Sequence, residues 1–252
     1  MKKFNNVYKY IYAITVVFIF WYLLHIILNS FVIPNPIDVI SRLFKVGYGI
    51  ISTHLIASLL RLLIALLITT ILGYSIGILI GVNDKLDNLI SPIVYLFFPV
   101  PRIAFLPVFM ILFGLGNTSK IVLIVAIAIF QIIISVRDGA KEIPNELILS
   151  AKSLKLSKSQ MMKHIYIPAT LPRLFTAMRI ALGSSMAALF FAENYATKYG
   201  IGYYIMNSWI KVDYEGMYCG IIIISLLGIV MFKVIDILQS RISITLNITI
   251  RS

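Results

Sequence analysis

The sequence predicts an all-α integral membrane protein with about six transmembrane helices, and two observations carry this prediction. Hydrophobic residues make up 60% of the 252-residue chain and charged residues only 13%, with a mean hydropathy of +0.96, which is far from the balance of soluble domains. The chain also contains several runs of about twenty apolar residues, the length that crosses the hydrocarbon core as a helix. The lipid bilayer is therefore the first partner that the sequence implies.

Six apolar runs fit such helices. We interpret the first as a retained span, because it is longer than the apolar region of a signal peptide and lacks a cleavage pattern. The fourth is short, with only sixteen uncharged residues between Lys120 and Arg137. The runs are residues 10–31, 57–82, 89–115, 119–136, 174–194 and 217–238.

Three polar segments separate these runs. Residues 34–54 are expected to hold a short amphipathic helix, residues 137–173 form the longest polar segment, and residues 195–216 form an outer loop. There is no internal repeat or shift of composition, so we expect one transmembrane domain over residues 1–252. The lone cysteine, Cys219, excludes an intramolecular disulfide.

The basic residues indicate an orientation rather than a nucleic-acid partner. The formal net charge is +12, but lysine and arginine stand at span ends and in the polar segments, and no basic domain is present to bind nucleic acid. These residues collect on the cytoplasmic side of membrane proteins. With the N-terminus inside, the cytoplasmic pieces hold 14 of the 22, the outer pieces five and the spans three. This count predicts a multi-pass protein with both termini in the cytoplasm.

Three glycines mark one face of the second span. Gly73, Gly77 and Gly81 lie on one side of a helix, because residues four apart are neighbours on its surface. Without side chains there, another helix can approach closely in lipid. We therefore expect this face to pack against a neighbouring span.

Prolines are predicted to break the third span. Pro99, Pro101 and Pro107 fall within nine residues, and each removes a backbone donor that a regular helix needs. Irregular backbone at membrane depth is tolerated only where protein buries it or water reaches it. This stretch is therefore a candidate for a translocation pathway, with a kinked helix or a short surface loop as the alternatives.

Two charged residues are further candidates for this pathway. Arg102 follows the prolines and Glu193 ends the fifth span, and an ionisable residue within the membrane is a functional candidate by default. Arg102 is expected either to attract an anionic solute or, as the favoured interpretation, to snorkel or pair with Glu193. Glu193 has two possible roles, a proton relay or a structural partner.

The polar segment 137–173 is predicted to form two short helices. Pro144 suits the first turn of one helix, and Ser157 begins an S-x-x-Q capping box that starts the second. Pro168 and Pro172 are expected to end the second helix before the fifth span. Such a pair, with apolar contacts and basic rims, fits a groove on a soluble partner. An amphipathic helix on the membrane surface is an equal alternative from position alone.

The sequence offers no recognisable catalytic or metal-binding set. It contains no Walker-type glycine loop, HExxH motif or serine elbow, and its three histidines lack ligand spacing. We therefore expect no metal site and no catalytic site in this chain. An intramembrane enzyme is an unfavoured alternative.

The polar segment resembles the cytoplasmic coupling loop, or EAA loop, of ABC importer permeases, which has the pattern E-A-A-x3-G-x9-I-x-L-P. The x9 spacing is intact, and Lys155 stands at the glycine, where a left-handed backbone costs a lysine about 1 kcal/mol. Leu149 and Ile167 also depart from the pattern, which implies either a matched ATPase, the favoured interpretation, or altered coupling. The coupling residues that the resemblance implies are Leu149, Ser150, Ala151, Leu154, Lys155, Ser157, Met161, Ile165 and Pro168.

Residues 34–238 are similar to one branch of these permeases, the nitrate/sulfonate/taurine type. The matching stretches include PVPRIAFLPVFMILFGLGNTSKI, IPATLPRLFTAMRIALG and FFAENYATKYGIGYYI. The resemblance implies a type I ABC importer permease fold in the cell membrane of a prokaryote. It also implies transport of a small solute, and Arg102 and Arg179 favour an anion of the sulfonate, taurine or nitrate class.

The resemblance implies the partners as well. Two permease subunits pair, here expected as a homodimer, and two cytoplasmic ABC ATPase subunits dock on the coupling loops. An extracytoplasmic substrate-binding protein delivers the solute. ATP and Mg would be bound by the ATPase, and no cofactor is expected on this chain. The alternative is a carrier or channel that works without an ATPase, in which the long docking segment would lack a purpose.

Overall fold

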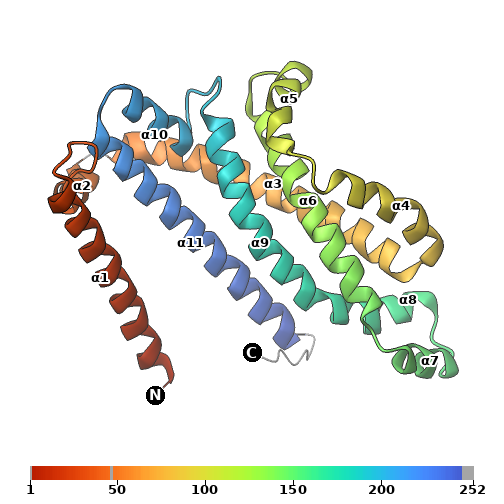
Figure 1. Ribbon diagram of the computed structural model, residues 1–252. Helices are drawn as coiled ribbons and strands as arrows, with labels where there is room; N and C mark the ends of the chain where they lie inside the picture. The colour runs from red at the N-terminus through yellow and green to blue at the C-terminus, as the bar shows by residue number, and fades with distance from the viewer. Residues whose placement is uncertain (1, 46–47, 246–252) are drawn as a thin grey trace.

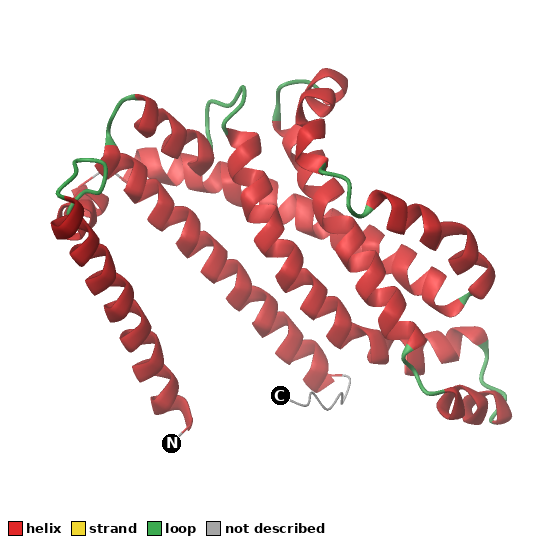
Figure 2. Cartoon of the chain, in the orientation of Figure 1, coloured by secondary structure: helices red, strands yellow, loops and turns green. Residues whose placement is uncertain are grey.

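The computed structural model describes residues 2–45 and 48–245, and these form helices and loops without a β-strand (Figures 1 and 2). The predicted domain of residues 1–252 also includes residues 1, 46–47 and 246–252, which lie outside the described residues. The elements are α1 (Lys2–Leu28), α2 (Pro36–Lys45), α3 (Tyr48–Val82), α4 (Asp84–Phe97), the 3-10 turn η1 (Arg102–Phe105), α5 (Leu106–Phe113), α6 (Asn117–Lys141), α7 (Asn145–Ser153), α8 (Lys158–Met161), the π-helical turn η2 (Met162–Tyr166), α9 (Ile167–Glu193), α10 (Ile201–Ile210) and α11 (Tyr214–Thr245).

Five of the described helical stretches are long and apolar enough to cross a membrane, and a bent pair gives a sixth if its two parts count as one span. The five lie in α1, α3, α6, the continuous run from α8 to α9, and α11. The pair consists of α4 and residues Arg102–Phe113, which are bent by 83°. The predictions of about six spans and of a break in the third are therefore confirmed.

The ends of the helices define two sides of the molecule. In Figure 1, the start of α1 and the end of α11 lie on the same side as α7 and α8, while α2, α5 and α10 lie on the opposite side. On that opposite side Arg42 of α2 donates to both oxygens of Asp213, at 2.6 and 2.7 Å, and to Glu215 at 3.3 Å. Burial lowers the pKa of Arg42, but the two carboxylates outweigh it, so that the pKa lies above its usual value.

The core lies where α3, α6, α9 and α11 meet. Leu62, Ile124 and Leu182 are fully buried there, and apolar side chains of α11 complete the cluster. Gly73, Gly77 and Gly81 of α3 lie against α6: a Cβ added at any of them would approach an α6 atom to between 2.6 and 3.0 Å. By contrast, no residue in the apolar window of α1 is buried.

The long helices α1, α3, α6, α9 and α11 are all longer than the spans predicted for them. The helix α3 begins at Tyr48, so that the polar segment 34–54 holds α2 and the start of α3 rather than one short helix. The helix α6 covers 25 residues, from Asn117 to Lys141, because it continues past Arg137, where the predicted span ended. Near its start, the ammonium of Lys120 donates to the carbonyls of Leu115 and Gly116, at 2.9 and 3.1 Å, so that its charge has polar partners inside the protein.

The prediction that Pro168 and Pro172 end a helix is wrong. The chain stays helical from Lys158 to Glu193, with Pro168 in the first turn of α9 and Pro172 inside α9. The carbonyl four residues before Pro168, with which its ring would clash, belongs to His164 in the middle of the π-helical turn. The wider turn makes room for the ring, which is how helices accommodate such a proline.

Candidate functional site

The segment between α6 and α9 folds as two short helices joined by a tight turn. Lys155, at the glycine position of the coupling pattern, has a left-handed backbone with φ of 54°. Its N–H donates to the carbonyl of Lys152 at 2.9 Å, and the next N–H reaches the carbonyl of Ala151 at 3.2 Å, which closes the C-terminus of α7. The capping box of Ser157 and Gln160 starts α8, as predicted. These local bonds hold the loop in shape despite the lysine.

The predicted coupling residues divide into an outward and an inward set. Leu149 and Leu154 are 61% and 77% exposed, so that they form an apolar surface on the outside of the loop. Ala151 and Met161 are 4% and 9% exposed and pack inside it. Ser150 donates to a carbonyl of its own helix. The remaining members are Lys155 and Ser157 in the turn, Ile165 in the π-helical turn and Pro168 in the first turn of α9.

The broken span holds Arg102 at its break. The backbone leaves α4 after Phe97, and Pro99 and Pro101 separate it from the turn η1, while Pro107 lies in the first turn of α5. The guanidinium donates to the carbonyls of Phe97 and Phe98, both at 2.6 Å, which closes the end of α4. It also lies 4.5 Å from the centre of the Phe130 ring, a cation–π geometry.

Arg102 does not pair with Glu193, so the pairing that formed one half of the favoured prediction is wrong. Glu193 instead binds Arg61 of α3, with the guanidinium 2.6 Å from one carboxylate oxygen. The Ser58 hydroxyl, at 2.8 Å, and the Gly202 N–H, at 2.9 Å, also donate to it. Glu193 is 0% exposed, and the network joins the first half of α3 to the end of α9 and the start of α10. This arrangement favours the structural role over a proton relay.

Further polar partners, not predicted from the sequence, complete this network around Glu193. Arg61 also donates to the side chain of Asn117, at the start of α6, and to the carbonyl of Tyr199, at 2.8 and 2.7 Å. His54 accepts from the N–H of Gly200, and Ser58 accepts from the next N–H. The four-residue and three-residue steps from His54 to Ser58 to Arg61 put all three on one face of a helix, and this spacing was the available signal.

A second missed network lies at the other end of the membrane domain. Asp87, in the first turn of α4 and 4% exposed, binds Arg137 of α6 through two bonds, Nε to Oδ1 at 2.6 Å and Nη2 to Oδ2 at 2.9 Å. Lys141 of α6 and Ser91 of α4 also bond to it. Arg137 and Lys141 both follow a predicted span end, where charged side chains are usually expected to face solvent.

Arg179, which we had taken to favour an anionic solute, is bonded within the protein. Its guanidinium donates to the side-chain oxygen of Gln239 at 2.8 and 2.6 Å and lies 3.7 Å from Asp236. These contacts link α9 to α11. Arg102 therefore differs from Arg61 and Arg179, since no carboxylate of a described residue pairs with it.

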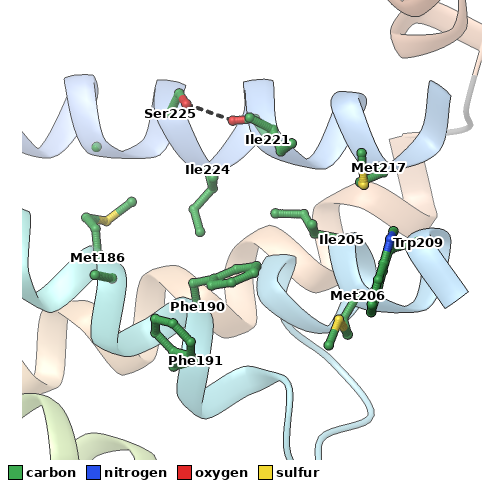
Figure 3. A pocket seen from close by; sticks show the side chains of 12 residues that line it. Met186, Phe190, Phe191, Ile205, Met206, Trp209, Met217, Ile221, Ile224 and Ser225 are labelled. Atoms are coloured by element: carbon green, nitrogen blue, oxygen red, sulfur yellow. Dashed lines mark hydrogen bonds between the residues drawn. The ribbon is translucent and has the colours of Figure 1, made fainter. Parts of the chain in front are cut away.

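An apolar pocket of about 670 Å³ opens between α9, α10 and α11 (Figure 3). Phe190, Met206 and Trp209 contribute large side chains to its wall. Ser225 is also there, but its hydroxyl donates to the carbonyl of Ile221 in its own helix at 2.8 Å. The pocket thus presents apolar contacts and no charged group, which makes it unsuited to hold an anion. The described residues contain no cluster of metal-ligating side chains.

Comparisons with known proteins identify the class of protein. A family model described as "Binding-protein-dependent transport system inner membrane component" matches residues 70–244. The chain belongs to this family, whose members are the permease subunits of ABC importers. Its fold is the type I ABC importer permease fold: it matches the inward-facing MetNI methionine ABC transporter with a TM-score of 0.63 at 20% identity, covering 79% of this chain and 97% of that chain.

Relatives with named functions share most of the chain. The taurine transport system permease protein of Escherichia coli (strain K12) is 29% identical over 223 residues, which covers 86% of this chain and 81% of that protein. A nitrate import permease protein of Leptolyngbya laminosa is 31% identical over 186 residues, with coverage of 74% and 67%. The chain is thus a multi-pass membrane protein and a transport subunit that works with an ATPase and a substrate-binding protein.

Proposed function

We propose that this permease forms the translocation pathway for a small anion of the sulfonate, taurine or nitrate class. The observation that carries the proposal is the unneutralised charge of Arg102. This arginine lies at the break of a membrane span, and no carboxylate of a described residue pairs with it. A charge in that position is costly unless it has a partner. Nη2 makes both hydrogen bonds to these carbonyls, which leaves Nη1 and Nε as donors for an anion in transit. The relatives named for taurine and nitrate support the same class.

The same proposal includes the assembly and the orientation. We place residues 1–252 in one transmembrane domain that pairs as a homodimer in the cell membrane of a prokaryote, with both termini in the cytoplasm. The basic residues support this orientation, and so do the ends of α1 and α11, which lie on the side of α7 and α8. In this arrangement the coupling loops face the ATPase subunits, which bind ATP and Mg, while this chain carries no catalytic site.

Replacing Arg102 tests the proposed cargo class. We expect Arg102→Gln, which keeps donors for the two carbonyls but loses the charge, to lower uptake about tenfold, or ~1.4 kcal/mol. Arg102→Lys, which keeps the charge, should be affected less. The measurement is uptake of labelled taurine and of labelled nitrate into proteoliposomes that hold the whole transporter, with Arg179→Gln as control because Arg179 already has protein partners. If Arg102→Gln takes up either anion at the normal rate, Arg102 is not the contact for the anion. If the unaltered transporter takes up neither taurine nor nitrate, the proposed cargo class is wrong.

The outward leucines test the coupling loop. We expect Leu149→Asp with Leu154→Asp to reduce co-purification of the cognate ATPase by tenfold or more, because burying one leucine contributes about 1.5–3 kcal/mol. Met161 is less suitable, since it is buried inside the loop and its replacement would disturb the fold. Lys85→Asp, an exposed site on the same side outside the loop, is the control. If the double variant folds and binds ATPase normally, these leucines are not the docking surface. If no ATPase binds the unaltered protein, the carrier alternative gains support.

A further inference from the structure

We propose that Asp87 is the positioning residue that joins the base of the coupling loop to the broken span, so that movement of the loop is transmitted to the pathway. The inference rests on the proposed coupling function of the loop. Only three residues, 142–144, separate the end of α6 from α7, and Ile143 among them is buried. A short, packed connection of this kind carries a displacement of α7 directly into the last turn of α6.

The last turns of α6 are bonded to the start of α4 through Asp87. Arg137 meets the carboxylate with two parallel bonds, a geometry that fixes orientation as well as distance. Lys141, the last residue of α6, adds a further bond to the same carboxylate. Because Asp87 is 4% exposed, water competes little for these partners, and low local dielectric strengthens them.

The contact between α6 and α4 extends beyond one residue. The Arg137 guanidinium also lies 5.7 Å from the centre of the Tyr95 ring and donates to its hydroxyl at 3.2 Å. Asp87 and Tyr95 are eight residues apart, or roughly 12 Å along the helix, so Arg137 holds α4 over about two turns. This pairing makes α4 and the end of α6 move as one body.

The path from the loop ends at the break of the span. The helix α4 stops at Phe97, and Arg102 bonds the carbonyls of Phe97 and Phe98. A rotation of α4 therefore moves the residue that we propose as the contact for the anion. The route runs through contiguous packed and bonded elements, which are the kind of network that carries energetic coupling between sites.

A comparison of two carboxylates on Arg137 isolates the proposed role. Asp138 also accepts from Arg137, at 2.7 Å, but it belongs to the same helix and bridges nothing. We expect Asp87→Asn to lower the number of solutes carried per ATP hydrolysed by about tenfold, with the ATPase still bound and active, while Asp138→Asn leaves this ratio unchanged. The measurement is taurine or nitrate uptake against phosphate release in the same proteoliposomes, which hold permease, ATPase and binding protein.

The outcomes separate this inference from the proposed function. A normal ratio in Asp87→Asn overturns the positioning role. A ratio that stays normal while uptake and hydrolysis fall together shows a structural role and also overturns it. If the ATPase does not bind the unaltered permease, the proposed coupling function of the loop is itself overturned. If Asp87→Asn does not fold, Arg137→Gln is the test variant. It removes the two bonds between Arg137 and Asp87, while Lys141 and Ser91 still pair the carboxylate. The inference then requires the ratio of solute carried to ATP hydrolysed to fall in Arg137→Gln, and an unchanged ratio overturns it.

Discussion

Replacing Glu193 by alanine is expected to destabilise the membrane domain by about 3–5 kcal/mol, because it leaves the Arg61 charge buried without its counterion. Glu193 is 0% exposed and accepts bonds from Arg61, Ser58 and Gly202. The loss should lower the thermal unfolding midpoint of the purified protein in detergent by several degrees. It should also loosen α10, whose first turn is held by the same carboxylate.

A second glutamate at the same side provides the control for this result. Glu215 also pairs with an arginine, Arg42, at 3.3 Å, but 44% of its side chain is exposed. Exposed ion pairs contribute roughly 0–1 kcal/mol, so Glu215→Ala should change the midpoint little. The double replacement Arg61→Met with Glu193→Met should recover part of the loss, because neither charge then remains buried. If Glu193→Ala and Glu215→Ala lower the unfolding midpoint equally, the buried network around Glu193 does not stabilise the protein as expected.

The architecture was predictable because its determinants are local or set by the bilayer. A run of about twenty apolar residues has one physical use in such a chain, and the capping box of Ser157 needs only residues within one turn. The left-handed backbone at Lys155 was implied by the resemblance, because the residue stands at the glycine of the coupling-loop pattern. Features of this kind are encoded within a few residues and can be inferred from the sequence alone.

The ion pairs were less predictable, because a partner depends on how the helices pack. Arg102 and Glu193 were paired on the ground that both carry charge in the membrane, yet Glu193 binds Arg61, 132 residues away along the chain. The position of each residue along its helix was the neglected information: Arg61 lies in the first half of α3 and Glu193 is the last residue of α9, whereas Arg102 lies at the break between α4 and α5. Similarly, Asp87 and Arg137 become partners only once α4 is folded against α6.

The prolines illustrate a different limit of sequence reasoning. Proline removes a hydrogen bond wherever it stands in a helix, and that rule correctly placed the break at Pro99 and Pro101. The rule failed at Pro168 and Pro172, where the helix continues. A π-helical turn before α9 accommodates the ring of Pro168. A turn of this kind has no signature in residue type, so the difference between a break and a continued helix emerges from packing.

Replacing Gly77 by alanine is expected to destabilise the contact of α3 with α6, although alanine favours a helix by about 1 kcal/mol over glycine. The added Cβ would lie 2.8 Å from the carbonyl oxygen of Ile133 and 2.9 Å from the Cβ of Val136. The carbonyl belongs to the backbone of a buried helix and cannot rotate away, so the two helices must separate. Overpacking of this kind costs about 1–3 kcal/mol, which outweighs the gain in helix propensity.

The sign of the effect distinguishes packing from propensity. Gly228, in α11, has only the terminal methyl of Met186 near an added Cβ, at 3.6 Å, an ordinary contact. Gly228→Ala should therefore leave the unfolding midpoint unchanged or raise it, whereas Gly77→Ala should lower it, both measured in the same detergent. If Gly77→Ala were also stabilising, α3 and α6 could not lie as close as described. Since Gly81 meets the backbone of Arg137 on the same face, that result would also weaken the proposed link through Asp87, which depends on the end of α6 being held firmly against α3.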